Sequence, residues 1–309
     1  MSDLRVQTGP LLTEDSQILV TKPKLEHDIR AVRTLFDRLL TVLCALLSLL
    51  AAFPLFGVLW LLVERGASKF RWEMLWSLPP SGLETTGGGF GNAIAGTFYM
   101  VAIAGLLAIP TGVLTAIYLA EYGDKKRLAS AIRFAAKVLT GMPSILAGIF
   151  AYAVVVLAVG RFSALAGGTA LAVLMLPIVA LTAEEAIRAV PRRIKEAAVG
   201  MGATSAQVVC RVTLPTAMPS ILTGVMLAVA RAAGETAPLL FTAQFSNYWP
   251  RFQHEDTASL AVMIYQFSGS PYEHQIDMAW TAALVLVLLV LLFNVIGQVL
   301  AHNQHQSHR

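Results

Sequence analysis

Two oppositely charged residues, Arg231 and Glu235, lie in a stretch of otherwise apolar and small residues. An ionised side chain at the centre of a bilayer costs about 2.5 to 3.5 kcal/mol on insertion scales, so it normally faces a partner or a water-filled path. Residues four apart share one face of a helix, which lets these two side chains neutralise each other. In a second interpretation the planar donors of Arg231 bind an oxyanion, and Glu235 accepts a proton that this anion still carries.

The protonation of the anion decides which ligand suits this pair. Phosphate at neutral pH keeps at least one proton, whereas sulfate keeps none and is repelled by a carboxylate. Ser144, which follows Pro143 in another apolar stretch, can donate a hydroxyl hydrogen bond to a passing anion. The same hydroxyl can bond the backbone at the proline kink, so both interpretations of Ser144 stay open.

The elements that carry these residues are apolar helices. Of the 309 residues, 56% are hydrophobic and 14% are charged, a balance typical of a membrane protein. A membrane helix needs about 20 predominantly apolar residues. Six stretches reach or approach this length, at residues 39–63, 92–120, 138–160, 169–183, 217–243 and 278–301. The sequence therefore predicts an all-α integral membrane protein of six spans, the fourth of them short.

Lys and Arg gather in alternate loops, so the excess of positive charge, +4 in all, lies on one side of the predicted spans. Basic residues are frequent before the first span, after the second and after the fourth. After the third and fifth spans, Arg161 and Arg251 are the only Lys or Arg, and acidic residues offset the basic ones after the first. Because cytoplasmic loops carry the excess of Lys and Arg, both termini are predicted to be cytoplasmic, with tails over residues 1–38 and 302–309.

The predicted cytoplasmic loop 184–216 contains two short helices. The first begins near Arg192, and Gly202 supplies the backbone freedom for the turn that ends it. Thr204 and Gln207 have the T-x-x-Q spacing of a capping box, which starts the second helix. Pro215 is expected to separate that helix from the fifth span.

Small residues at the centre of this loop leave room for another protein to approach the backbone closely. They are Ala197, Ala198, Gly200, Gly202 and Ala203. A helical hairpin that lies on lipid headgroups suits the same composition, because basic residues precede the small ones. Composition alone therefore leaves a protein partner and a lipid surface open.

The order of residues from Glu196 to Pro215 resembles the signature of binding-protein-dependent ABC importer permeases. Glu-Ala-Ala, three residues, Gly, nine residues, an aliphatic residue, one residue and Leu-Pro all match, with Val212 where Ile is usual. The resemblance implies a type I importer permease of MetI-like architecture, whose loop docks a separate ATPase. The residues that it implies for coupling to the ATPase are Glu196, Ala197, Ala198, Gly202, Leu214 and Pro215.

The segment 231–243 is similar to the phosphate-specific (Pst) transport permeases, and most of all to their PstA-like members. Its run is Arg-Ala-Ala-Gly-Glu-Thr-Ala-Pro-Leu-Leu-Phe-Thr-Ala, and residues 96–122, 141–145 and 176–185 also agree with that family. The resemblance covers about residues 90–300. It implies the permease subunit of an inorganic phosphate importer in the inner membrane, forming half of a heterodimeric channel. The residues that it implies for the substrate path are Arg231, Glu235, Thr236, Ser144 and Glu184.

The same resemblance implies the partners of the chain. They are a PstC-like second permease, a PstB-like ATPase dimer and a PstS-like phosphate-binding protein. ATP and Mg are expected on the ATPase, so this chain is expected to bind no cofactor or metal and not to be an enzyme. The outer loop Gln244–Asp277 is expected to receive the binding protein. Its aromatic residues Tyr248, Trp249, Tyr265 and Tyr272 suit the membrane interface.

One departure from the family pattern concerns Glu184. Many members carry Arg three positions before it, where this chain has Leu181. The ion pair expected there is therefore lost. Glu184 is then expected to be no more than a solvated residue at the inner membrane surface, and its place among the path residues rests on the resemblance alone.

Other functions remain open on the sequence. The permease can serve another oxyanion or a polar organic solute, and a signalling scaffold that reports phosphate status is compatible with the same fold. A membrane-embedded phosphatase or acyltransferase is disfavoured, because the ionisable residues of the outer loop lack metal-ligand spacing. Those residues are His254, Glu255, Asp256, Glu273, His274 and Asp277.

Overall fold

The computed structural model describes residues 32–81, 84, 86–123, 126–250 and 255–306. Most of the predicted N-terminal tail, Lys125, Arg251, His254 and the last three residues of the chain lie outside them. The chain divides into two units, residues 1–57 and 58–309. All regular secondary structure of the described residues is helical, which confirms the predicted all-α class.

Helix α1 (Val32–Ser68) makes up the described part of the first unit and continues into the second. It begins at Val32, inside the segment predicted to be a tail. Apolar side chains are exposed around its whole circumference within the first unit. Among them are Leu39, Leu46, Leu50 and Phe53. A helix that is apolar on all sides suits hydrocarbon or a protein partner rather than water.

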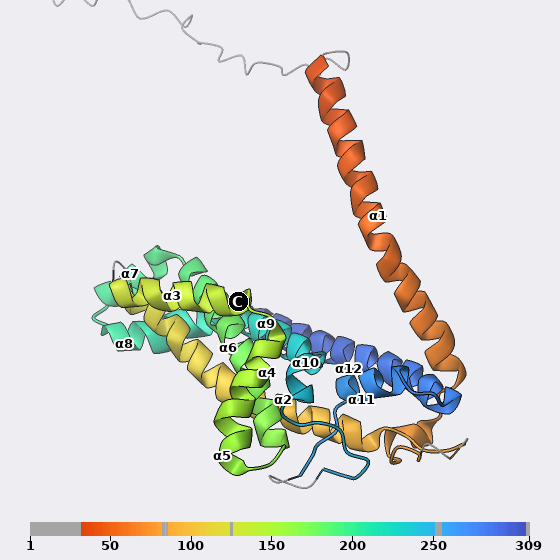
Figure 1. Cartoon of the computed structure of the whole chain (residues 1–309). Helices are drawn as coiled ribbons and strands as arrows, with labels where there is room; N and C mark the ends of the chain where they lie inside the picture. The colour runs from red at the N-terminus through yellow and green to blue at the C-terminus, as the bar shows by residue number, and fades with distance from the viewer. Residues whose placement is uncertain (1–31, 82–83, 85, 124–125, 251–254, 307–309) are drawn as a thin grey trace, which may run out of the picture. The chain divides into compact units, whose positions relative to one another are not determined.

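Three long helices form the centre of the second unit: α2 (Gly91–Ile117), α6 (Ala164–Ala189) and α9 (Leu214–Ala233) (Figure 1). Met100, Leu171 and Val225 belong to the buried core between them. The packing of α2 on α6 is close, since a Cβ atom built on Gly168 of α6 would lie only 2.6 Å from Cβ of Ile103. Small residues allow such approach between membrane helices, where dispersion contacts replace the hydrophobic effect.

Helix α6 is longer than the predicted fourth span, 169–183. Ser163 caps its start by accepting a hydrogen bond from the backbone N–H of Ala166, at 3.2 Å. Pro177 lies buried inside the helix without ending it. The small residues before Thr169 are therefore helical too, and the 26 residues of α6 are long enough to cross the hydrocarbon core.

The third predicted span, 138–160, contains a sharp bend. Helix α3 (Arg127–Thr140) meets a second helical segment, Ser144–Val159, at 106°. That segment consists of α4 (Ser144–Ala151), a π-turn and α5 (Leu157–Val159). Pro143 disfavours helix at the residue before it, which places the bend at Gly141–Pro143. The apolar span therefore starts at Ser144, while α3 carries Arg and Lys and is amphipathic.

A second core lies between the long helix α12 (Glu273–Gln306), the short helix α11 (Leu260–Ser268) and the start of α2. Its fully buried members include Phe90, Leu260, Met263 and Met278. The outer loop predicted over Gln244–Asp277 thus contributes a helix, α11, that packs one face on this core, besides exposed chain. Helix α12 continues to Gln306, so the predicted C-terminal tail is helical over residues 302–306.

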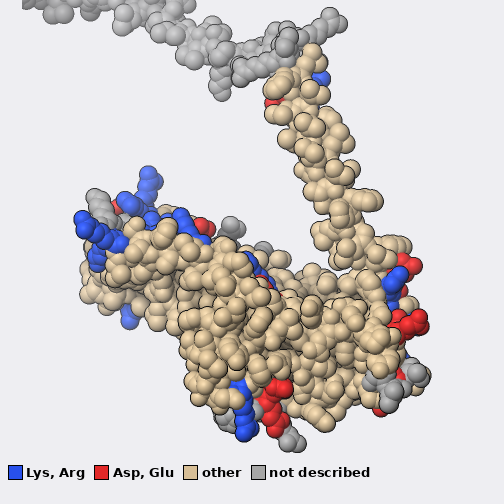
Figure 2. All heavy atoms as spheres, viewed as in Figure 1, with Lys and Arg blue, Asp and Glu red and all other residues tan. Residues whose placement is uncertain are grey.

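Most charged side chains gather at the ends of the helices, and the surface between them is largely uncharged (Figure 2). Lys and Arg gather over α3, α7 (Arg192–Gly200) and α8 (Ser205–Val208), a region called the basic end below. Five described helices are long and apolar enough to cross a membrane, and the bent pair brings the number to six at most. This agrees with a protein of several membrane spans.

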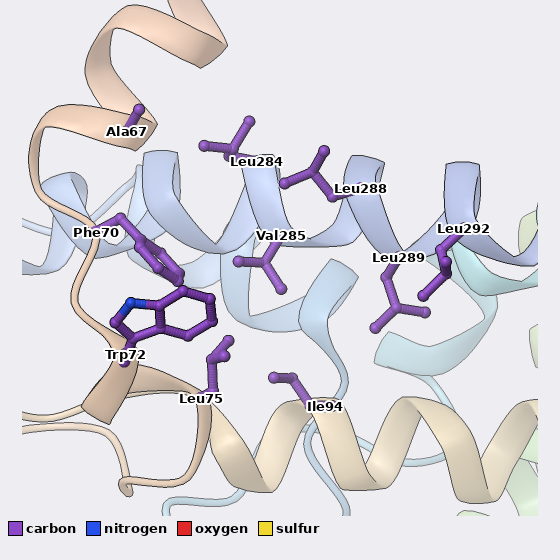
Figure 3. A pocket seen from close by; sticks show the side chains of 10 residues that line it. All are labelled: Ala67, Phe70, Trp72, Leu75, Ile94, Leu284, Val285, Leu288, Leu289 and Leu292. Atoms are coloured by element: carbon purple, nitrogen blue, oxygen red, sulfur yellow. The ribbon is translucent and has the colours of Figure 1, made fainter.

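One apolar groove of about 690 Å³ lies between α12, the start of α2 and the segment that follows α1 (Figure 3). Phe70 and Trp72, packed edge to face, line one wall, and leucines of α12 line the opposite one. Such a lining suits an acyl chain or an apolar side chain. Its lining contains no charged donor for an oxyanion, so this groove does not suit the predicted anionic ligand.

Candidate functional site

Two short helices, α7 and α8, are joined by a tight turn at the basic end. Gly202 has φ +87, and its N–H bonds the carbonyl of Val199 at 2.9 Å. The N–H of Ala203 bonds the carbonyl of Ala198 at 3.1 Å, which completes a Schellman motif. The left-handed backbone explains the glycine, and the predicted turn at Gly202 is confirmed.

The second helix of this pair is capped as predicted. The Thr204 hydroxyl accepts a hydrogen bond from the N–H of Gln207, and the Gln207 side chain accepts one from the N–H of Thr204. This reciprocal capping box satisfies two backbone donors that the start of a helix leaves free. The capping and the Schellman turn together fix the shape of the α7–α8 hairpin without help from another chain.

The surface of the α7–α8 hairpin is open and partly apolar. Met201 at its tip is 84% exposed and Val199 is 58% exposed. A Cβ atom built on Gly202 would meet nothing within 4 Å, so no described residue covers the turn. Exposed apolar side chains on such a projection suit contact with another protein or with a membrane surface.

The prediction that Pro215 separates α8 from the next span is wrong. Residues Ser205–Ala233 form one continuous helical segment, in which a π-turn over Val209–Thr213 precedes α9. The N–H of Leu214 bonds the carbonyl of Val209, five residues back. In a regular helix, a proline ring clashes with the carbonyl four residues before it. For Pro215 that carbonyl lies in the π-turn, whose wider spiral makes room for the ring. The hairpin is therefore joined directly to α9.

Arg231 and Glu235 lie where α9 ends. Helix α9 stops at Ala233, and the next short helix, α10 (Ala237–Leu240), starts after a break. The Nε atom of Arg231 lies 3.6 Å from Oε1 of Glu235, and the two side chains are 51% and 17% exposed. The guanidinium is therefore held only loosely by this carboxylate, and half of the Arg231 side chain is exposed.

The predicted fifth span, 217–243, is therefore interrupted rather than continuous. Pro238 lies in the first turn of α10, where its missing N–H costs nothing, but it cannot continue a helix from Gly234. The N–H groups of Gly234 and Glu235 make tight i−3 bonds that close the end of α9. The break places the charged pair beside non-helical backbone. At membrane depth, non-helical backbone is found only where it is buried in protein or lines a water-filled cavity.

One stripe of α9 is exposed in the described part of the chain, and four of its five residues are polar. Its exposed residues are Thr216, Ser220, Thr223, Leu227 and Arg231. These residues recur every three or four positions, so they lie on one helix face that ends at Arg231. The stripe extends from the hairpin to the charged pair over about 22 Å at 1.5 Å per residue.

Exposed stripes of the neighbouring helices have a different composition. Leu106 and Leu114 of α2 are 77% and 66% exposed, and Leu288 and Leu292 of α12 are 54% and 57% exposed. Those faces suit lipid. The hydroxyls of Thr216 and Thr223 bond carbonyls one turn back in their own helix, which leaves oxygen lone pairs on the stripe. The polar face of α9 therefore suits a water-filled path or a second protein.

Ser144 and Thr236 belong to elements near this end of α9: Thr236 precedes α10, and Ser144 starts α4, which packs on α10. Thr236 is the residue at which α10 starts, and its carbonyl accepts from the N–H of Leu239 at 3.1 Å. Helix α4 packs on α10 at Gly148, where an added Cβ would lie 2.7 Å from Cα of Pro238. Ser144 is half-buried one turn away on that face of α4. Within the described part of the chain, no residue hydrogen-bonds its hydroxyl.

Glu184 belongs to a different place, and the expectation that it is a solvated residue is wrong. Its side chain is 7% exposed, and Oε1 accepts from Nε of Arg133 at 2.6 Å and from Nε of Arg188 at 2.9 Å. A pocket of about 410 Å³ lies beside these residues, with Leu181 in its wall. Two arginines thus pair with Glu184 although position 181 holds leucine, and the arrangement is typical of a structural ion-pair network.

Replacing Glu184 by Gln should lower the stability of the protein. The change leaves two guanidinium groups without their shared counter-ion, and breaking a buried pair usually costs 3–5 kcal/mol. Because Arg133 and Arg188 keep 26% and 45% exposure, water offsets part of this, and we expect about 2 kcal/mol. Thermal unfolding in detergent measures the loss. The control is Glu185→Gln at the exposed neighbouring position, and equal stability of the two variants would contradict the assigned network.

The pairs at the basic end were missed by sequence reasoning. Sequence spacing assigns no partner to Arg133, Glu121 or Lys195. In the structure Nζ of Lys195 lies 2.6 Å from Oε1 of Glu121, across 74 residues of sequence. The available signal was the occurrence of acidic residues in otherwise basic loops, but that signal does not identify their partners.

The four aromatic residues of the outer loop are exposed. Tyr248, Trp249, Tyr265 and Tyr272 have exposures of 75%, 46%, 60% and 45%. Asn92 at the start of α2 anchors the loop, because its Nδ2 donates to the carbonyls of Ser246 and Tyr248. The loop is thus tied to the bundle while its aromatic side chains remain available at the surface.

The family comparison gives a match over most of the membrane region. Residues 108–308 match the model of the family described as binding-protein-dependent transport system inner membrane component. The chain is 39% identical over 251 residues to the phosphate transport system permease protein PstA of Yersinia pestis, covering 80% of this chain and 85% of that protein. It is 37% identical over 259 residues to the PstA of Pasteurella multocida, covering 82% and 91%.

Solved structures give the same fold. A chain of the MetNI methionine ABC transporter, in an inward-facing conformation, is similar with a TM-score of 0.55 and 22% identity. The similarity covers 80% of this chain and 98% of that chain. The arrangement of helices is therefore one that an ABC transporter uses, and the low identity limits this likeness to the fold.

Proposed function

Because the chain belongs to the family of binding-protein-dependent transport system inner membrane components, we propose that it is the permease subunit of an ATP-driven inorganic phosphate importer. Its several apolar helices make it a multi-pass inner membrane protein. The relatives that match this chain over most of their own length are named as phosphate transport permeases, and their names support this cargo. The chain is a transport subunit rather than an enzyme.

The observation that carries the proposal is the polar stripe of α9 that ends at Arg231. A guanidinium that is 51% exposed at membrane depth, next to a helix break, offers donors to an oxyanion entering from outside. The Glu235 carboxylate accepts a hydrogen bond from the P–OH group of a phosphate monoanion or dianion and orients Arg231. The hydroxyls of Ser220 and Thr223 continue the polar face toward the basic end, and Thr236 and Ser144 flank the break.

The α7–α8 hairpin supports docking of a separate ATPase. Its exposed apolar tip, Met201 and Val199, has no covering element in the described part of this chain. Glu196 and Ala197 are exposed on the same helix, while Ala198 packs inward. Since the hairpin is continuous with α9, movement at the ATPase surface reaches the helix that bears Arg231 directly. Leu214 and Pro215 lie at the junction and couple the two.

The assembly proposed around this chain has four kinds of partner. A PstC-like permease covers the polar stripe of α9, a PstB-like ATPase dimer binds the hairpin, and a PstS-like protein delivers phosphate at the outer loop. ATP and Mg are bound and used on the ATPase, not on this chain. The basic end is the cytoplasmic end in this arrangement, which follows the excess of Lys and Arg there.

The selectivity of the pair tests the cargo. In cells that depend on this chain, labelled phosphate should enter even in a large excess of sulfate, since Glu235 repels a fully ionised anion. Replacing Glu235 by Gln removes that repulsion, and the sulfate concentration that halves phosphate uptake should fall about tenfold. Glu255→Gln, in the outer loop, serves as the control. Strong competition by sulfate in the parent protein would contradict phosphate as the preferred ligand.

A further inference from the structure

The π-turn Tyr118–Tyr122, at the basic end of α2, is a point where four helical elements meet. A π-turn widens the backbone spiral and leaves a carbonyl free of its usual helical partner. The carbonyl of Leu119 accepts hydrogen bonds from Nη2 of Arg133 in α3, at 2.7 Å, and from Nη2 of Arg188 in α6, at 3.3 Å. Side chains from two other helices therefore satisfy the backbone of this turn.

The same two arginines bind Glu184 of α6 through their Nε atoms. Each guanidinium thus bridges one carboxylate oxygen and one backbone carbonyl. We call Arg133, Arg188, Glu184 and the Leu119 carbonyl the arginine clamp. Charge-assisted bonds of this kind are directional, so the clamp fixes the π-turn against α3 and α6.

Two residues after Leu119, the π-turn is also joined to α7. Oε1 of Glu121 lies 2.6 Å from Nζ of Lys195, and these side chains are only 17% and 20% exposed. Lys195 lies directly before Glu196 in the hairpin. Of the nine residues of α7, all of them described, Ala198 alone is buried. The Glu121–Lys195 pair is therefore a major attachment of α7 to the bundle, where apolar packing is slight.

We infer that the Glu121–Lys195 pair carries the movement of the α7–α8 hairpin to α2. The inference rests on the proposed function, in which an ATPase moves the hairpin. The hairpin already reaches α9 through the continuous helix, and the ion pair gives it a second route, into the end of α2. The arginine clamp holds the turn that bears Glu121, so a displacement of Lys195 moves α2 rather than only the turn. Glu121 and Lys195 are positioning residues, since neither contacts phosphate.

The test compares phosphate import with ATP hydrolysis in the complete complex, reconstituted in proteoliposomes. In Glu121→Gln and in Lys195→Met, ATP hydrolysis should stay within about twofold of the parent, while phosphate imported per ATP falls about tenfold, within the range of measured couplings between sites. Arg127→Gln, at an exposed position of α3 outside the hairpin, should leave the ratio unchanged. A role in folding alone would lower import and hydrolysis together.

Charge reversal makes the test specific to the pair. Glu121→Lys and Lys195→Glu should each uncouple the complex, and the double variant should regain most of the import per ATP. A double variant no better than the single ones contradicts the inference, and so does an unchanged ratio in Lys195→Met. Loss of the ATPase from purified variants would assign the pair to docking instead and also overturn it. Failure of the proposed function shows separately, as a parent complex that hydrolyses ATP without importing phosphate.

Discussion

Replacing Arg231 by Ala should reduce phosphate import by about ten- to hundredfold at limiting phosphate. Hydrogen bonds to a charged group contribute roughly 1.5–3 kcal/mol, and each 1.4 kcal/mol corresponds to a factor of about ten. The Arg231 side chain is half exposed and weakly paired, so its loss leaves no unpaired charge in the core and should not unfold the protein. Uptake of labelled phosphate and the amount of assembled complex in the membrane are measured together.

Arg231→Lys and Arg161→Gln distinguish the proposed role of the guanidinium from a general effect of charge. Lysine keeps the charge without the planar fork of donors, so import should recover only in part. Arg161 is exposed in the segment that follows α5, and its replacement should leave import unchanged. Normal import by Arg231→Ala would show that Arg231 does not bind the substrate. The Arg231–Glu235 pair would then serve only to neutralise the two charges.

Replacing Met201 by Glu should abolish binding of the ATPase while the permease still folds. Met201 is 84% exposed at the tip of the hairpin, so a charge there costs this chain little by itself. In an interface the same carboxylate is desolvated without a partner, which costs several kcal/mol. The measurement is recovery of the ATPase when the permease is purified from membranes in mild detergent, with ATP-dependent import as a second readout.

The matched control for Met201→Glu adds the same charge at the opposite end of the molecule. Gln266 is exposed on α11, and Gln266→Glu should leave ATPase recovery unchanged. Full recovery of the ATPase with Met201→Glu would show that the tip of the hairpin is not covered. The hairpin would then rest on lipid headgroups, as its basic flank also allows.

Local rules explain what could be predicted at the hairpin. The positive φ at Gly202 and the capping box of Thr204 and Gln207 depend on residues within five positions of one another. Such interactions follow from spacing alone, because the backbone brings those atoms together in any helix terminus. Membrane spans were likewise accessible, since length and hydropathy decide them.

Helix interruptions were less predictable, because proline has opposite effects in different settings. Pro215 lies inside a continuous helix, where a π-turn accommodates its ring. Pro238 marks a real break, since Gly234 lies four residues before it and α9 ends there. The sequence shows proline in both places, and the surrounding packing determines which one ends the helix.

The ion pairs of the basic end depend on tertiary packing and so could not be found by spacing. Arg133 reaches Glu184 across 51 residues, and Lys195 reaches Glu121 across 74. Their partners become neighbours only after α3, α6 and α7 pack around the end of α2. This explains the error at Glu184, where the absence of arginine at position 181 was taken to leave the carboxylate unpaired.

The central claim is best tested by phosphate accumulation in proteoliposomes that contain the complete purified complex. Labelled phosphate should accumulate inside only when the binding protein and phosphate are outside and ATP with Mg is available on the ATPase side. Removing ATP should abolish accumulation. Accumulation of phosphate to the same level without ATP, or steady ATP hydrolysis with transport of another solute and none of phosphate, would contradict the assignment of this chain as a phosphate importer permease.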